Sequence, residues 1–146
     1  MRTKDRTATE IDMDTAARLR LVVMRLARRL RQQAESDASP TMLSAMATIE
    51  RGSLTLGELA EAERVQPPTM TRVVARLEEL GLISRVPDPQ DKRVARVSLS
   101  AEGRKLIARN RSRKTAYLAK RLRATNVAEA DLSKAVEILE TILNED

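Results

Sequence analysis

The sequence predicts a mainly α-helical domain that carries one small β-hairpin. Apolar residues recur at helical spacing through most of the chain, but residues 82–86 and 94–99 form two short runs rich in β-branched side chains. Between these runs, Pro87 to Arg93 are turn-forming residues with charges at the tip. A length of 146 residues predicts a single domain over 1–146.

The composition excludes several classes of function. The sequence contains no Cys and no His, which excludes thiol redox sites, Cys/His zinc sites and catalytic dyads built on these residues. We find no Gly-rich phosphate loop and no plausible nucleophile with its base, so we expect no catalytic residues, no cofactor and no metal. No signal peptide and no membrane span are evident, and the lack of Cys fits a cytoplasmic protein that does not contact a membrane.

The net charge of +6 favours a polyanionic partner, although solubility alone would also explain it. Tyr117 is the only aromatic residue. Proteins that read single strands commonly stack bases on aromatic side chains, whereas duplex DNA can be held through its phosphates and read by a helix. The composition therefore favours duplex DNA over single-stranded nucleic acid.

Two helices are predicted before Gly52. The first covers about residues 14–35, where these apolar residues follow helical spacing: Ala16, Leu19, Val22, Val23, Leu26 and Leu30. Ser39 and Pro40 are a good N-cap and first residue for a second helix that runs to Arg51.

Two further helices are predicted between Gly52 and the hairpin. Thr55 and Glu58 match a capping box, which predicts a short helix through Leu59 to Arg64. The prolines after Gln66 fit the first turn of the next helix, because that turn has no use for their missing N–H groups. This helix is amphipathic and its predicted inward face consists of Met70, Val73, Val74, Leu77 and Leu80.

Two helices joined by a tight turn and followed by a hairpin predict a winged helix-turn-helix over about residues 39–100. The segments "VARLEELGLISR" and "DKRVARVSLSAEG" resemble two sequence signatures of the MarR-type (multiple antibiotic resistance) transcriptional regulators. The resemblance covers nearly the whole chain. It departs from the family pattern at Ser100, where threonine is usual, and at Pro67 and Pro68, where small polar residues are usual.

The resemblance implies where the chain would contact DNA. The helix over 66–80 would lie in the major groove and the arginine of the wing would enter the minor groove, where a planar cation suits base edges and negative potential. Asp91 would orient an arginine by an ion pair. The candidate DNA-binding residues are Gln66, Thr69, Thr71, Arg72, Arg76, Asp91, Lys92 and Arg93. Alternatively, these residues form a solvated helix face and an ordinary charged turn.

Two more helices are predicted after the hairpin, from Ser100 to about Ala124 and from Asn126 to Asn144, with Asn126 and Glu129 as the cap of the second. The last helix carries an apolar stripe. We expect the segments 11–35 and 101–146 to form a homodimer across a two-fold axis, because the DNA-binding core is too small to bury the apolar faces of both terminal helices. Packing of these helices within one chain is the alternative.

The leading hypothesis is a sequence-specific homodimeric repressor that binds an inverted-repeat operator in double-stranded DNA. By family analogy alone, a small-molecule effector would lower its DNA affinity. Met24, Met42, Met46 and Tyr117 could line an adaptable apolar pocket, although methionines at helical spacing also serve as ordinary core. The alternative function is a non-specific architectural or nucleoid-type protein that coats DNA.

Overall fold

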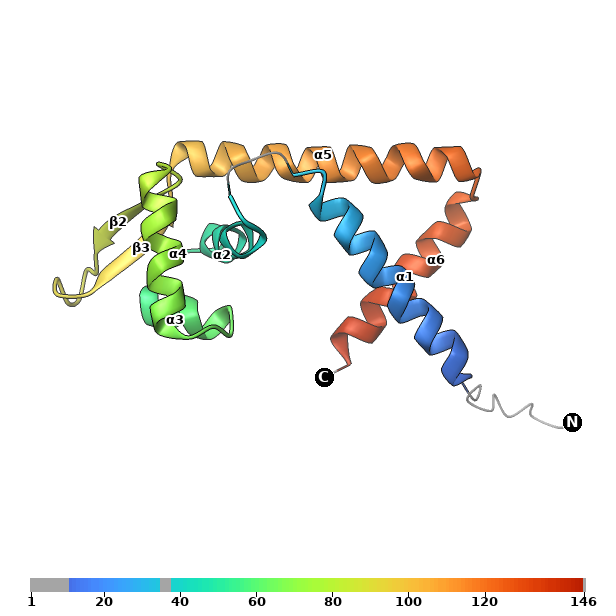
Figure 1. Ribbon diagram of the computed structural model, residues 1–146, viewed down its shortest axis with the longest axis horizontal. Helices are drawn as coiled ribbons and strands as arrows, with labels where there is room; N and C mark the ends of the chain where they lie inside the picture. Colours follow the sequence, from blue (N-terminus) through green and yellow to red (C-terminus); the bar gives the residue numbers. More distant parts are fainter. Residues whose placement is uncertain (1–10, 35–37, 146) are drawn as a thin grey trace, which may run out of the picture.

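The computed structural model describes residues 11–34 and 38–145, and it confirms the predicted fold class: a mainly helical chain with a small antiparallel sheet (Figure 1). The elements in chain order are α1 Met13–Arg31, α2 Pro40–Glu50, β1 Leu54–Thr55, α3 Leu56–Ala62, α4 Pro67–Glu79, β2 Ile83–Pro87, β3 Ala95–Leu99, α5 Ala101–Thr125 and α6 Glu129–Asn144.

The core lies between α2, α3, α4 and the sheet, and the first turns of α5 close it. Among the fully buried side chains are Met46 of α2, Leu59 of α3, Leu77 of α4 and Val97 of β3. These side chains come from four different elements, so the winged domain folds around one shared core.

The predicted helix starts are confirmed for α2, α3 and α4. The Ser39 hydroxyl accepts a hydrogen bond from the Met42 N–H at 3.3 Å. Thr55 and Glu58 form the expected capping box, so α3 begins at Leu56 directly after the N-cap. The helix ends at Ala62 rather than at Arg64. α4 begins at Pro67 directly after Gln66.

The sheet contains one strand more than the sequence predicts. β1 pairs antiparallel with β3, which also pairs with β2, so the strand order is β1-β3-β2. A strand of two residues has no periodicity that a sequence could reveal, and only its partner defines it. The predicted hairpin is otherwise confirmed, with a loop over residues 88–94.

The ends of two helices differ from the prediction. The first helix ends at Arg31, where Gln32 closes the last turn; residue 35, its predicted end, lies outside the described residues. Asn126 was predicted as the N-cap of the last helix, and this is wrong. It is the C-cap of α5 in a left-handed conformation, with φ of 54°, which asparagine tolerates better than most residues, and Ala128 precedes α6 instead.

The terminal helices α1 and α6 stand apart from the winged domain: α6 descends from the far end of α5, and the end of α1 lies below the middle of α5 (Figure 1). No residue of α1 or α6 is buried. Large apolar side chains are exposed on both helices, including Val22 and Met24 on α1 and Ile138 and Ile142 on α6. Within the described part of the chain, no helix is both long and apolar enough to cross a membrane.

Candidate nucleic-acid interface

Helix α4 presents a polar, cationic face to solvent. Its inward residues Met70, Val74 and Leu77 are fully buried, which leaves Thr71, Arg72 and Arg76 exposed on the opposite side and Thr69 half-buried. The burial pattern therefore follows the amphipathic period predicted from the sequence.

The two arginines of this face differ in their partners. Arg76 Nη1 lies 3.0 Å from Glu79 Oε2, one turn further along the same helix. Arg72 makes no hydrogen bond or ion pair with any other described residue. Its guanidinium is therefore the freer of the two to bind an external acceptor.

The neighbouring polar side chains Gln66 and Thr71 differ in whether they already form a hydrogen bond within the helix. Gln66, the N-cap residue, makes no side-chain capping hydrogen bond. The Thr71 hydroxyl donates to the Pro67 carbonyl at 3.0 Å. Because its proton is used in this way, Thr71 offers an outside partner only its lone pairs and its methyl group.

The wing loop carries a bidentate ion pair at its tip. Arg93 Nε and Nη2 lie 3.0 and 3.2 Å from the two carboxylate oxygens of Asp91, so the expected pairing of Asp91 with an arginine is present. The hydrogen bond from the Arg93 side chain lowers the pKa of Asp91. The Arg93 side chain is still 90% exposed, and Lys92 beside it is exposed too.

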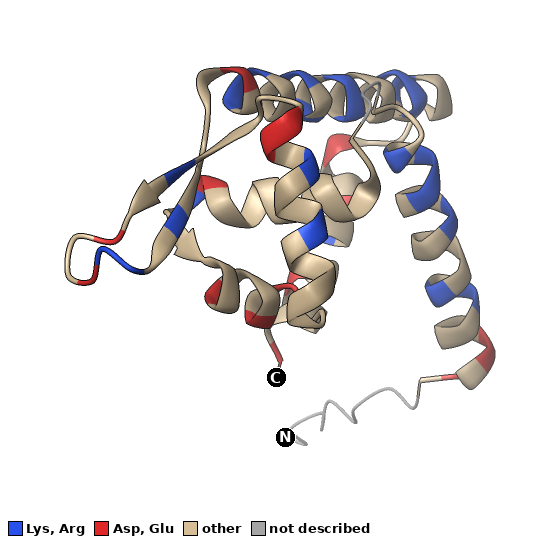
Figure 2. Cartoon of the chain, turned by 60° about the vertical axis from the view of Figure 1, so that its left-hand side comes forward, with Lys and Arg blue, Asp and Glu red and all other residues tan. Residues whose placement is uncertain are grey.

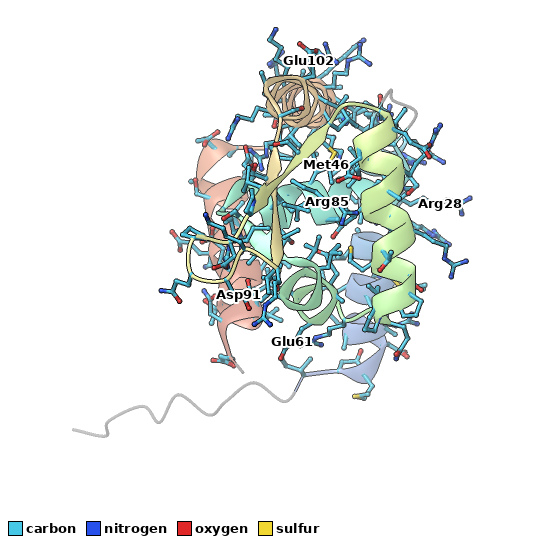
Figure 3. All side chains as sticks on the ribbon, turned by 90° about the vertical axis from the view of Figure 1, so that its left-hand side faces the viewer. Arg28, Met46, Glu61, Arg85, Asp91 and Glu102 are labelled. Carbon is cyan, nitrogen blue, oxygen red and sulfur yellow. The ribbon has the colours of Figure 1, made fainter. Side chains whose placement is uncertain are left out.

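The wing and α4 lie at the same end of the molecule (Figures 2 and 3). Figure 3 views this end directly, with α4 on one side, the hairpin and its labelled residue Asp91 on the other, and α3 between them. Arg85 of β2 links the two elements through an ion pair with Glu78 of α4. The structure thus brings the candidate DNA-binding residues of α4 and those of the wing to the same end of the molecule.

A further arginine, which was not among the residues predicted to contact DNA, lies at the base of the wing. Arg96 of β3 contacts Ser53, Glu58 and Asp88, which belong to three separate segments. The alternation of β3 places Arg96 on the face away from the core, but only the fold shows which acceptors surround it.

A cavity of about 370 Å³ lies between α2 of the winged domain, the long helix α5 and the end of α1. Its walls come from the end of α1, from α2 and from α5, and they include the cations Arg31, Arg111 and Lys114. Asn110 also lines it; this residue is only 4% exposed and its Nδ2 has no hydrogen-bond partner among the described residues.

An ion pair joins α5, which forms one wall of the cavity, to the end of α2. Arg111 Nη1 lies 3.1 Å from Glu50 Oε1 at the end of α2, and its second nitrogen contacts Oε2. The hydrogen bond from Arg111 lowers the pKa of Glu50, and the same contact raises the pKa of Arg111.

The four predicted pocket residues do not come together at this cavity. Met42 and Met46 are buried in the core, and Figure 3 shows Met46 inside the winged domain. Met24 is 57% exposed on α1, and the ring of Tyr117 lies under the Arg121 guanidinium at 5.7 Å. Asn110 was not predicted to line a pocket; its helical spacing after Leu106 and Ile107 places it on the inward face of α5.

The helix-turn-helix of α3 and α4, followed by the β2–β3 hairpin, defines the chain as a winged-helix DNA-binding protein. The profile of the MarR family matches residues 39–95. The HTH-type transcriptional regulator MT0903.1 of Mycobacterium tuberculosis is 40% identical over 137 residues, covering 92% of this chain and 96% of the relative. The chain therefore belongs to the MarR family and is a DNA-binding transcriptional regulator, a class of protein that is not enzymatic.

Two more distant relatives extend this comparison. The HTH-type transcriptional repressor MdtR of Bacillus subtilis is 29% identical over 104 residues, covering 70% of this chain and 65% of MdtR. The crystal structure of a MarR family protein from Bacillus stearothermophilus superimposes with a TM-score of 0.80 at 26% identity, covering 92% of this chain and 97% of that chain.

Proposed function

We propose that the protein is a sequence-specific, homodimeric repressor that binds an inverted repeat in duplex DNA and responds to a small molecule. The observation that carries this proposal is the exposed cationic face of α4 at the same end of the molecule as the Arg93 wing tip. A helix of this kind fits the major groove of B-DNA, while a neighbouring wing reaches the adjacent groove.

Each candidate residue then has its own role. Arg72, which has no partner among the described residues, would contact a base edge. Arg76 would leave Glu79 and bind a phosphate or a base instead. The wing tip would insert Arg93 into the minor groove, with Asp91 holding its guanidinium in one orientation. The remaining candidates Gln66, Thr69, Thr71 and Lys92 would contact base edges or phosphates.

The terminal helices support a homodimer. The apolar faces of α1 and α6 are exposed, and contiguous exposed apolar surface is typical of an interface. The charges are also complementary: Asp14 is the one acidic residue of α1, which is otherwise rich in arginine, whereas the charged residues of α6 are acidic apart from Lys134. A second copy would therefore match α1 of one protomer with α6 of the other, and residues 11–35 and 101–146 would form the dimerisation part around a DNA-binding core over 39–100.

The cavity supports the response to an effector. Its volume lies within the ~300–1,000 Å³ range of small-molecule sites, and it touches α2 of the DNA-binding core as well as α5 and the end of α1. An unpaired amide donor together with Arg31, Arg111 and Lys114 favours a small organic anion. Occupancy would shift α5 relative to α2 and so change the spacing of the two recognition helices. The repressor role follows the similarity to MdtR, which is named a repressor.

Footprinting of the purified protein on the DNA upstream of its own gene tests the proposal. We expect protection of an inverted repeat whose half-site centres lie about one helical turn apart, ~34–36 Å, because two-fold related helices must meet one side of the duplex. The affinity for this site should exceed that for random duplex at the same salt concentration by at least ~10³-fold. Equal affinities would favour an architectural protein that coats DNA instead.

A further inference from the structure

Arg96 joins three segments of the winged domain through one guanidinium group. Its Nη2 donates to the Ser53 carbonyl at 2.8 Å and its Nε donates to the Ser53 hydroxyl at 3.2 Å, which binds the turn before β1. Its Nη1 donates to Asp88 Oδ2 at 3.0 Å, at the start of the wing loop. Nη2 also lies 3.5 Å from Glu58 Oε2 in the first turn of α3.

The Asp88 end of this cluster shapes the wing loop itself. Asp88 Oδ1 accepts hydrogen bonds from the N–H groups of Gln90 at 2.8 Å and Asp91 at 3.2 Å, while Oδ2 faces Arg96. The Asp88 N–H donates to the Val94 carbonyl at 2.9 Å and closes the loop. Arg96 therefore holds the residue whose carboxylate folds the segment that ends in Asp91 and Arg93.

The Glu58 end connects the same guanidinium to the helix-turn-helix. Glu58 also accepts a hydrogen bond from the Thr55 N–H in the capping box of α3. Helix α3 packs directly against α4. The chain of contacts thus runs from the wing loop through Arg96 to α3 and from there to the helix that carries Arg72.

The cluster is well suited to hold the wing in place. The Arg96 side chain is 25% exposed and that of Asp88 is 16% exposed, so solvent screens their ion pair less than one at the surface. A planar guanidinium can serve several acceptors in fixed directions, which the single ammonium of lysine cannot do. In β2 the residues after Ile83 are exposed, and the Arg85–Glu78 ion pair joins this strand to α4 but does not reach the wing loop.

We propose that Arg96 is a positioning residue for DNA recognition: it fixes the wing loop relative to α4 and so sets where the Arg93 guanidinium meets DNA. The inference rests on the proposed function, in which Arg93 contacts DNA. In this arrangement Arg96 itself does not touch DNA, since its guanidinium is occupied by Ser53, Glu58 and Asp88.

Hydrogen exchange of the free protein tests the structural half of the proposal without DNA. Arg96→Ala should raise the exchange rates of the Asp91 and Val94 amides about tenfold or more, because the loop loses the anchor of Asp88. Amides in the middle of α4 should keep their wild-type rates. Arg96→Lys, which keeps the charge and most of the side-chain volume, should also accelerate exchange in the loop. Unchanged loop exchange in both variants would overturn the proposal.

A double-mutant cycle on DNA tests the functional half. The probe is the duplex that the wild-type protein selects from a random pool. Arg96→Ala and Arg93→Ala should each weaken binding about tenfold, and the double variant should be hardly weaker than either, because Arg96 acts through Arg93. Arg109→Ala, which removes one exposed positive charge from α5, is the control for net charge and should change affinity less than about threefold.

The results of the double-mutant cycle distinguish the positioning role of Arg96 from the proposed contact of Arg93 with DNA. Additive losses in the double variant would show that Arg96 acts independently of Arg93 and would overturn the positioning role. If Arg93→Ala alone binds the selected duplex as well as wild type does, the proposed contact of the wing with DNA fails. The exchange experiment still decides in that case whether Arg96 holds the loop.

Discussion

Gly103 lies so close to Leu82 that a Cβ atom on Gly103 would sit 2.0 Å from the Leu82 carbonyl oxygen. The same oxygen accepts a hydrogen bond from the Ser100 N–H at 3.0 Å, and the Ser100 hydroxyl donates to the Gly81 carbonyl at 2.6 Å. These contacts seat the first turn of α5 on the turn that follows α4. The relation between the winged domain and the long helix therefore depends on a residue without a side chain.

Gly103→Ala should destabilise the fold. A methyl group at this position must push two backbone segments apart, and overpacking of this kind costs about 1–3 kcal/mol of the free energy of unfolding. Urea denaturation measures the change. Gly57→Ala is the matched control: its Cβ would meet only the Thr55 hydroxyl oxygen at 4.0 Å, so it should be neutral or stabilising by less than about 1 kcal/mol. Similar losses in both variants would contradict this explanation.

Asn110→Leu should stabilise the ligand-free protein. The buried Nδ2 of Asn110 has no partner among the described residues, and an unsatisfied buried donor costs about 1–3 kcal/mol. Leucine has a similar volume and no such donor, so the urea midpoint should rise by the equivalent of about 1 kcal/mol. Any compound that releases the wild-type protein from its operator should release this variant less well. A lower midpoint would show instead that the amide serves the fold.

Arg72 and Arg93 should affect DNA binding in different ways. Arg72→Ala should weaken operator binding by about 1–3 kcal/mol and relax the preference at particular base pairs, as expected for a lost bidentate base contact. Arg93→Ala should instead alter the preference at flanking A·T-rich positions, because a minor-groove arginine responds to groove width. It should also flatten the salt dependence if phosphate contacts are lost.

A panel of single-base operator variants at two salt concentrations measures both effects. Arg109→Ala, with the same loss of charge on α5, controls for the general field of the protein. If Arg72→Ala and Arg93→Ala weaken all duplexes equally, neither groove assignment holds.

Removal of residues from Ala130 onward should abolish the dimer. The truncated chain loses the apolar face of α6 but no residue of the winged domain, so it should sediment as a folded monomer. Operator affinity should fall about 100-fold or more, because two half-sites are no longer bound together. Leu139→Glu in the full chain should act in the same direction by placing a charge on that face. Wild-type affinity in a soluble truncation would count against the dimer.

The wing should lose its order only at acidic pH. Hydrogen bonds from the Gln90 N–H and from Arg96 lower the pKa of Asp88, and Arg93 lowers that of Asp91. A lowered folded-state pKa contributes stability above the unfolded value, and this contribution is lost as the pH falls through the folded value. The loss should therefore begin below about pH 4, the usual pKa of aspartate. With no His in the chain, little should change between about pH 5 and 8.

Carboxyl-carbon NMR titration measures this directly. Asp88 and Asp91 should both titrate below the range of an unfolded peptide, and in Arg96→Ala the pKa of Asp88 should rise. A titration of Asp88 at or above the usual value in the wild-type protein would show that the loop contacts are absent in solution.

Local rules account for what the sequence determined by itself. The start of α2 at Ser39 and Pro40, the capping box of Thr55 and Glu58, and the prolines of α4 all act within a few residues of one another, so their effect can be predicted without the fold. The helical spacing of the apolar residues in α4 is also a local pattern, and it separates the buried face of this helix from the exposed face. These features, together with the turn residues before Arg93, were sufficient to predict the winged helix-turn-helix and to place Arg72 outside the core.

Only the tertiary structure decided the features that depend on distant partners. β1 exists because β3 lies beside it, and Asn126 ends α5 rather than starting α6 because the chain reverses there in a left-handed conformation. The acceptors around Arg96 come from segments up to 43 residues away, and the cavity beside Asn110 is bounded by three helices. Such contacts are brought together by packing of the core, and no local pattern in the sequence records them.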